Sequence, residues 1–288
     1  MQLSNSGAQI FVPDDTPPGE SIGRTTHMAI GAHQDDIPIM AHHGIMDCFG
    51  RTDGWFLGVT VTDGAGSPRG ELYAEYTDEQ MREVRNVEET KAAVVGDYTA
   101  ALLLDYPSSV AKDPDETILI EELTTIIGAA HPEVVYTHNL ADKHDTHVAV
   151  ALRTIEAIRR LDPEDRPTAL YGCEVWRDLD WMADADKVAF DVTDHGNLAA
   201  ALMGVYDSQV SGGKRYDLAT EGRRLAHATF SESHAVDAAQ ALIYAMDLTP
   251  VISDKTLDPA QHVLDHLDRL QTDITARIDR VTLPSKSV

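Results

Sequence analysis

The sequence predicts an α/β protein with a Rossmann-like, mostly parallel sheet flanked by helices. Two observations lead to this prediction. Short apolar runs of strand length recur along the 288 residues, and helical patterns separate most of them. Each run is also nearly continuous in Val, Ile, Leu and Ala, as expected for parallel strands that are covered on both faces.

The expected elements alternate along the chain. We predict strands at residues 28–32, 55–62, 100–104, 134–137, 169–173 and 188–192. We predict helices at about 39–48, 78–95, 116–130, 144–161 and 197–206. Strands that alternate with helices form βαβ units, which place the strands parallel in one sheet.

The two ends of the chain differ from this pattern. Residues 1–25 are expected to be an irregular N-terminal segment, and residues from about 212 to 288 a mostly helical C-terminal extension. The last segment, about 259–281, carries Leu264, Leu267, Leu270 and Ile274 at helical spacing and is expected to pack on the core or on a neighbouring subunit. Without an internal repeat or a low-complexity linker, residues 1–288 are predicted to form one domain.

Composition limits the class of partner. The formal net charge of -25 argues against unassisted binding to nucleic acid or to anionic membranes. There is no apolar run of membrane-spanning length and no secretory signal pattern, so a cytoplasmic protein is expected. Cys48 and Cys173 lie far apart in apolar contexts and are expected to be buried free thiols.

Three ionisable residues follow the first strong strand. His33, Asp35 and Asp36 stand where ligands bind in an open parallel sheet, beyond the carboxyl end of a strand. Neighbouring side chains in a tight turn point in different directions, so one carboxylate can bind a metal while the other faces a water on that metal. The alternative is that the aspartates cap the following helix, which accounts for only one of them.

A second polar cluster follows the strand at 134–137. His144 and His147 are three residues apart at the start of a helix and therefore share one face. Two of the histidines His33, His144 and His147, together with one aspartate, would give two imidazoles and a carboxylate converging from two strand ends. That is the arrangement of a catalytic zinc site with three protein ligands and one open position.

The motifs "AHQDD" and "HDTH", with "VTDGAGS" between them, resemble the PIG-L/LmbE-like family of zinc-dependent N-acetylglucosaminyl deacetylases and related amidases. The segments "REVRNVEETKAAVVG" and "DVTDHGNLAAALMGVYDSQ" occur in family order. The resemblance implies one Zn²⁺ per chain, bound by His33, Asp36 and His147. It implies that Asp35 is the general base and that His144 stabilises the oxyanion or moves a proton.

The resemblance also bears on the substrate site and has limits. Arg85 falls where the family often has an arginine near the substrate, although it can equally pair with Glu88 or Glu89 on a helix surface. Asp145 and Thr146 stand where the family commonly has Pro-Asp, so the group that orients His144 is expected to differ. Two further departures are Pro38 in place of a glutamate and Asp142 in place of a tyrosine. The loop "TDGAGSPRGELY" is expected at the edge of the pocket.

The function implied is hydrolysis of an N-acyl group, commonly N-acetyl, from an amino sugar or small glycoconjugate by a homo-oligomer. Two alternatives remain. One is a non-haem iron oxygenase in which Asp35 is the ligand and Asp36 a bystander, and the other is a family member that binds a sugar or metal without catalysis. The acidic chain is expected to prefer neutral N-acyl sugars unless arginines such as Arg69 and Arg85 offset its field.

Overall fold

The computed structural model describes residues 2–282, and in that range the strands form one eight-stranded sheet in the order β1-β4-β3-β2-β5-β6-β8-β7. β2 to β6 are mutually parallel where they pair, whereas β1 and β8 run antiparallel to their neighbours. The strands are β1 (Gln9–Phe11), β2 (His27–Gly31), β3 (Phe56–Thr62), β4 (Ala100–Tyr106), β5 (Val134–His138), β6 (Ala169–Cys173), β7 (Lys187–Asp191) and β8 (Leu242–Asp247). The predicted α/β fold with a mostly parallel sheet is confirmed.

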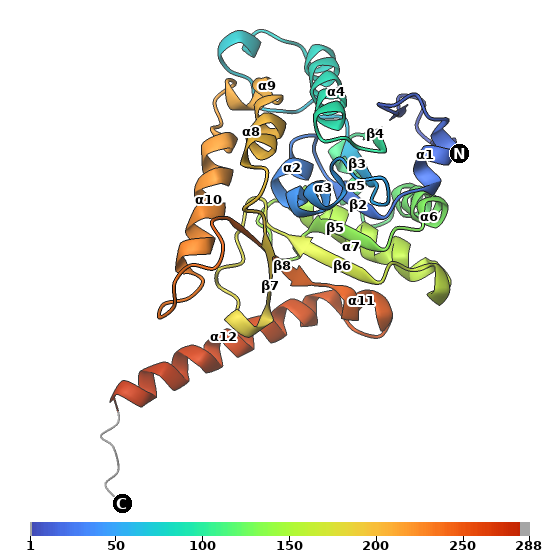
Figure 1. Cartoon of the computed structure of the whole chain (residues 1–288). Helices are drawn as coiled ribbons and strands as arrows, with labels where there is room; N and C mark the ends of the chain where they lie inside the picture. The colour runs from blue at the N-terminus through green and yellow to red at the C-terminus, as the bar shows by residue number, and fades with distance from the viewer. Residues whose placement is uncertain (1, 283–288) are drawn as a thin grey trace, which may run out of the picture.

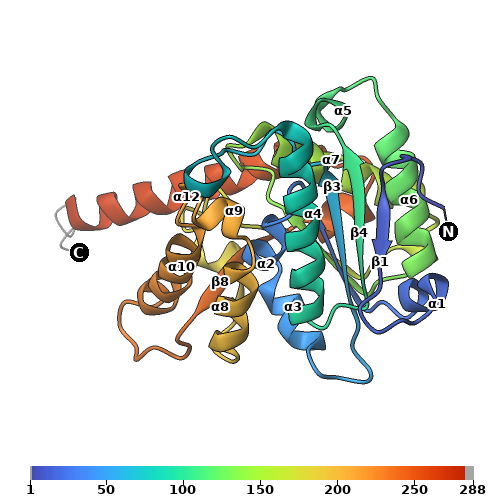
Figure 2. The ribbon, with the colours of Figure 1, turned by 90° about the horizontal axis from the view of Figure 1, so that it is seen from above.

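Helices cover both faces of the sheet (Figures 1 and 2). One buried apolar cluster includes side chains of α1, α6, α7 and α11, and the other includes side chains of α2, α3, α4 and α8. The helices are α1 (Pro18–Gly23), α2 (Asp36–Met40), α3 (His42–Cys48), α4 (Asp78–Val95), α5 (Ser108–Lys112), α6 (Ile118–Ala130), α7 (Asp145–Arg160), α8 (Gly196–Gly204), α9 (Asp207–Val210), α10 (Tyr216–Phe230), α11 (Thr249–Ser253) and α12 (Pro259–Thr282). Both faces of the parallel strands are therefore removed from water, which explains their continuous apolar sequences.

The register of the central strands positions the polar motifs. Ala29 of β2 pairs with Gly58 of β3 on one side and with Tyr136 of β5 on the other. Because β2 and β5 are parallel neighbours, their carboxyl ends meet at one edge of the sheet. The residues that follow these ends, His33 in one case and His144 in the other, are thereby brought together over more than a hundred residues of sequence.

The predicted elements agree with the structure in position, with three differences. The helix expected at 39–48 begins earlier and divides at Ala41 into α2 and α3. The N-terminal segment expected to be irregular contains β1 and α1. The C-terminal extension expected to be mostly helical contributes β8, which inserts between β6 and β7. β1 has only three residues and β8 only six, so neither shows a clear periodicity in the sequence. Both strands form because they pair with neighbouring strands in the folded sheet.

The last helix, α12, extends away from the rest of the molecule (Figure 1). Near its start, Val263 packs against the core, but Leu264, Leu267 and Ile274 are between 43% and 49% exposed. Packing on the core is thus confined to the beginning of the helix, and the homo-oligomer stays a prediction. Cys48 and Cys173 are buried free thiols, as expected. Within residues 2–282, no helix has the length and apolar character needed to cross a bilayer.

Candidate active site

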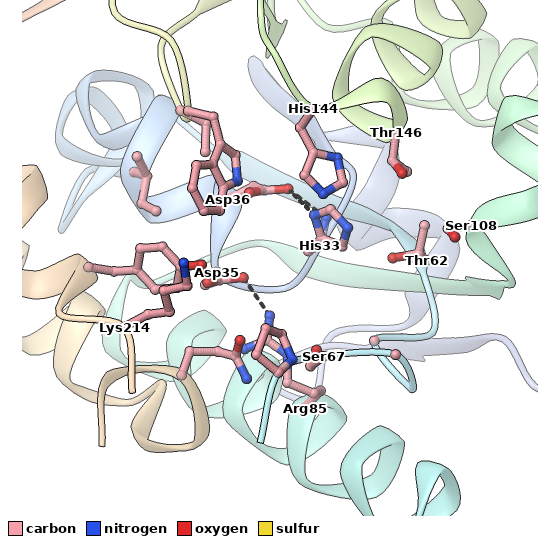
Figure 3. A pocket seen from close by; sticks show the side chains of 18 of the residues that line it. His33, Asp35, Asp36, Thr62, Ser67, Arg85, Ser108, His144, Thr146 and Lys214 are labelled. Atoms are coloured by element: carbon pink, nitrogen blue, oxygen red, sulfur yellow. Dashed lines mark hydrogen bonds and ion pairs between the residues drawn. The ribbon is translucent and has the colours of Figure 1, made fainter. Parts of the chain in front are cut away.

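A cavity of about 330 Å³ lies at the carboxyl edge of the parallel strands, and both polar motifs open into it. Figure 3 shows its side chains, with His33, Asp36 and His144 on one side and Arg85 and Lys214 around Asp35. The lining includes His33, Asp35, Asp36, Thr62, Gly64, Ser67, Arg85, Ser108, Lys112, His144, Trp176, Gln209, Lys214 and Tyr216. Five of the six sequence-predicted site residues line this cavity, and the sixth, His147, lies fully buried against them.

The turn after β2 aims His33 and Asp36 at each other. The Oδ2 atom of Asp36 accepts a hydrogen bond from the His33 backbone N–H at 2.7 Å and lies 3.1 Å from the Nδ1 atom of His33. α2 begins at Asp36, and no side-chain hydrogen bond caps its first turn. The capping alternative therefore does not account for either aspartate.

His147 completes the cluster from the first turn of α7. Its Nε2 atom lies 3.2 Å from the Nδ1 atom of His33 and 3.4 Å from the Oδ2 atom of Asp36. In a tetrahedral zinc site, ligand atoms about 2.0–2.1 Å from the metal lie about 3.3–3.4 Å from one another. The three atoms thus already have the mutual spacing of ligands around one divalent cation.

The charges around this cluster also favour the ionised carboxylate that a metal ligand requires. Burial acts to raise the pKa of Asp36, but the neighbouring imidazoles, with His147 the strongest, hold that pKa well below its usual value. The carboxylate is therefore ionised when the site is formed. A buried anion with imidazoles on several sides is a favourable environment for a cation, because an uncompensated buried charge is costly.

His138 is a neighbour of this cluster that the sequence reasoning missed. It ends β5, its ring stacks on that of His147 with centroids 3.9 Å apart, and its Nε2 atom lies 3.4 Å from the Oδ2 atom of Asp36. Two groups of potential ligands result, His33 with His144 and His147, and Asp36 with His138 and His147. However, the Nε2 atom of His138 already accepts the backbone N–H of Ala32 at 2.9 Å, which makes it less available to a metal. Its position at the carboxyl end of a strand was the signal in the sequence.

His144 lies at the N-cap of α7 and faces the cavity. Its ring stacks on His147 with centroids 4.5 Å apart and meets His33 edge-on at 5.1 Å. The Nδ1 atom of His144 is buried without a hydrogen-bond partner. Desolvation, followed by the charges of His147 and His33, lowers the pKa of His144, so the neutral imidazole is favoured. The ring is therefore held by stacking, with no carboxylate bonded to it.

Asp142, one of the departures from the family pattern, holds three parts of the site together. Its Oδ1 atom accepts the backbone N–H of His144 at 3.0 Å, and its Oδ2 atom accepts the backbone N–H of Trp176 at 3.1 Å. The Oδ2 atom also lies 3.4 Å from the Nδ1 atom of His147. A carboxylate behind the Nδ1 atom of a ligating histidine fixes the ring so that its Nε2 atom points to the metal.

Asp35 pairs with Arg85 and belongs to neither group of potential metal ligands. Its Oδ1 atom accepts a hydrogen bond from the Nη2 atom of Arg85, and the Nη1 atom of Arg85 lies 3.5 Å from the Oε2 atom of Glu88. Arg85 is only 1% exposed, so the helix-surface alternative for this residue is wrong even though its pairing with Glu88 is present. The two adjacent aspartates thus serve different neighbours, as expected for one metal-facing and one metal-free carboxylate.

Two loops form the rim of the cavity. Residues 62–64 and 66–68 line it, as expected for the segment "TDGAGSPRGELY". Gly64 has φ +69°, a left-handed conformation that favours glycine, and a Cβ atom there would also displace the side chain of Gln34. The other loop carries Lys214, in the segment "SGGKR", for which no role was predicted, and no role was predicted for Trp176 either.

One known protein family matches part of this chain. A family model described as "PIG-L: GlcNAc-PI de-N-acetylase" matches residues 28–158, the segment that carries both polar motifs. The match confirms the resemblance to this family that the motifs predicted. No curated protein matches the chain by sequence.

Three solved structures illustrate the shared fold. An N,N'-diacetylchitobiose deacetylase from Pyrococcus horikoshii is 15% identical with a TM-score of 0.60, over 76% of this chain and 83% of that one. GalB, the 4-carboxy-2-hydroxymuconate hydratase from Pseudomonas putida, is 15% identical with a TM-score of 0.61, over 78% and 96%. A zinc-inhibited form of the teicoplanin deacetylase Orf2 is 15% identical with a TM-score of 0.55, over 77% and 97%. At these identities the likeness extends to the fold alone.

Proposed function

We propose that this chain is a metal-dependent hydrolase that removes an N-acyl group, in the first instance N-acetyl, from an amino sugar or small glycoconjugate. The observation that carries the proposal is the approach of His33 Nδ1, Asp36 Oδ2 and His147 Nε2 to within 3.1–3.4 Å of one another. Asp35 lies beside them in the same cavity. The match of residues 28–158 to a family model described as a de-N-acetylase and the fold shared with a chitobiose deacetylase support the reaction class.

The donor set fits one Zn²⁺ per chain. Two imidazole nitrogens and one carboxylate oxygen are a common set of protein ligands in catalytic zinc sites. When bound, such an ion lowers the pKa of a coordinated water and polarises the acyl carbonyl, which are the two requirements of amide hydrolysis. His33, Asp36 and His147 would hold it, and Asp142 would hold His147 in place.

The remaining residues move protons and stabilise charge. Asp35, oriented by Arg85, is placed to take a proton from the attacking water and to return it to the amine leaving group. His144 faces the cavity with an unpartnered nitrogen, and as a neutral imidazole it can donate a hydrogen bond to the oxygen of the tetrahedral intermediate. The products are a carboxylate and a free amine.

The alternatives receive less support. An oxygenase with Asp35 as ligand requires that side chain to join the histidines, whereas Asp35 turns to Arg85 and is absent from both potential ligand groups. The hydratase among the related folds shows that the fold does not determine the reaction. The assay must therefore measure the amine that amide hydrolysis releases.

The test combines metal analysis with product detection. Purified protein is dialysed against chelator, reloaded with Zn²⁺, Co²⁺, Mn²⁺ or Ni²⁺, and incubated with a panel of N-acetylated amino sugars. We expect about one metal ion per chain and equal release of acetate and free amine. Release of neither product with any metal, or full activity after complete metal removal, would contradict the proposal. Inhibition by excess zinc is distinguished from a lack of activity by adding the metal stepwise from below one equivalent per chain and measuring hydrolysis at each step.

A further inference from the structure

We propose that the substrate of this site carries an anionic group, which the ammonium group of Lys214 binds beside the ring of Trp176. The inference rests on the proposed function, because it concerns the part of the same cavity that holds the remainder of the substrate. It deepens that function by specifying the chemical class of the amine-bearing carrier. Carboxylate and phosphate share the chemistry required.

The Lys214 side of the cavity comes from the part of the chain beyond the family match. Trp176 follows β6, and Gln209, Lys214 and Tyr216 lie at α9, in the loop after it and at the start of α10, whereas the family model ends at residue 158. The residues proposed to carry out the reaction all lie before residue 158. Side chains from outside the matched segment are suited to select the substrate.

Lys214 is held in place by its backbone and by an aromatic ring. Its N–H donates to the carbonyl oxygen of Gln209 at 3.1 Å, and its carbonyl oxygen accepts the N–H of Tyr216 at 2.8 Å. Its ammonium group lies 5.0 Å from the centre of the Trp176 ring. Trp176 in turn packs edge-on against Tyr216 with ring centroids 6.1 Å apart. A cation over an aromatic face that also lines a cavity offers both charge and a flat apolar surface for a sugar ring.

Lys214 is also a cation without a carboxylate partner in the part of the chain that the structure describes. Arg85 is engaged by Asp35 and Glu88, and Arg69 donates to the carbonyl oxygens of Ala65 and Tyr76 as well as to Asp78. The two arginines expected to offset the acidic field are therefore occupied. The chain has 48 acidic and 23 basic residues, so an unpaired lysine on the cavity wall provides a local positive charge in a protein that is negative overall.

Two lysines that line the cavity, Lys112 and Lys214, are candidates for binding the anion. In Figure 3, Lys214 lies on the Asp35 side of the cavity, and Ser108 lies on the opposite side, beyond His33. Lys112, at the end of the helix that Ser108 begins, also lines the cavity, but no aromatic ring holds its ammonium group in the described residues. We therefore assign the anion to Lys214.

The experiment measures binding of reaction products, which needs no turnover. Isothermal titration compares glucosamine with glucosamine 1-phosphate, glucosamine 6-phosphate and the carboxylate-bearing muramic acid at low and high salt. We expect at least one anionic sugar to bind about fivefold more tightly than glucosamine at low salt, the size expected for a partly exposed ion pair, and the difference to shrink at high salt. The phosphate and carboxylate arms show which anion is preferred.

Three variants assign the effect to a residue. Lys214→Met should abolish the preference. Lys255→Met, an exposed lysine that does not line the cavity, changes the net charge equally and should retain it. Equal binding of glucosamine and all anionic sugars to the wild type, an unchanged preference in Lys214→Met, or loss of the preference in Lys112→Met alone would overturn the inference. Hydrolysis of N-acetylglucosamine without any anion preference would refute this inference and leave the proposed function standing, whereas absence of amide hydrolysis would refute that function.

Discussion

The two sides of the cavity are built in different ways. The side formed by the ends of β2 and β5 is buried and polar, with the side chain of His147 fully buried and that of Asp36 only 5% exposed. The side formed beyond residue 158 is exposed at Lys214 and half-buried at Tyr216. The first has the rigid, charge-compensated character that a metal and a general base require, and the second has the accessibility that variable substrates require.

The buried side should respond most strongly to mutation. His147→Ala removes a nitrogen that lies within 3.4 Å of both other proposed ligands. Metal affinity should fall by more than the roughly 100-fold that loss of a supporting residue causes, and amide hydrolysis should fall with it. Competition with a chromogenic chelator measures the affinity.

The matched control is His234→Ala, which removes an exposed histidine outside the cavity. It should bind metal as the wild type does. Wild-type metal affinity in His147→Ala would show that His147 is not a ligand, and the comparison between the two sides would lose its basis.

Asp142 tests whether the support behind the metal cluster matters. Asp142→Asn keeps the shape of the side chain but removes the negative charge beside the Nδ1 atom of His147. Metal affinity should fall by roughly 10- to 100-fold, with the melting temperature of the metal-loaded protein falling less than in His147→Ala. Asp145→Asn, exposed three residues further on, is the control and should stay near wild type. If both variants bind metal equally well, Asp142 has no positioning role.

The third prediction concerns the free energy of unfolding and the protonation of Glu89, which is buried near Arg85. Burial raises the pKa of Glu89 to about 8, although the hydrogen bond from Tyr206 acts in the opposite direction. The folded protein therefore keeps a proton that the unfolded chain, with a carboxyl pKa near 4.5, releases. The free energy of unfolding should fall as pH rises from 4.5 to 8, because the folded state binds more protons in that window.

Glu89→Gln stays neutral and removes this dependence. It should match the wild type near pH 4.5 and exceed it by an amount that grows with pH to about 4 kcal/mol at pH 8, as followed by urea unfolding at several pH values. Glu83→Gln, an exposed residue of the same helix α4, should show no such gain. A constant difference between Glu89→Gln and wild type across the range would mean that Glu89 does not titrate as described.

Sequence patterns predicted the parallel part of the sheet because each buried strand needs a continuous apolar run. They also predicted that His33, Asp36 and His147 lie together, because the turn after a parallel strand determines where its next residues lie. β8 was missed, since its antiparallel position between β6 and β7 depends on contacts with distant segments. His138 was passed over because a histidine inside an apolar strand looks like a core residue until its partners are known.

The exposed side of the cavity was not predictable in the same way. Lys214 and Trp176 are 38 residues apart and follow different elements, so no local spacing connects them. Only packing shows that the lysine lies over the indole ring and opens into the cavity. The departure at Asp142 was visible, but its three hydrogen-bonding contacts depend on His147 and Trp176 being brought together by the fold.

The central claim is that the adjacent carboxylates have separate tasks, Asp36 on the metal and Asp35 beside its water. The most direct test measures metal stoichiometry and amide hydrolysis for Asp35→Asn and Asp36→Asn in parallel. We predict that Asp36→Asn loses metal, while Asp35→Asn retains about one metal per chain and loses roughly 10²–10⁴-fold in kcat. An Asp35→Asn protein without metal, together with an Asp36→Asn protein that retains it, would contradict the account and favour the oxygenase arrangement.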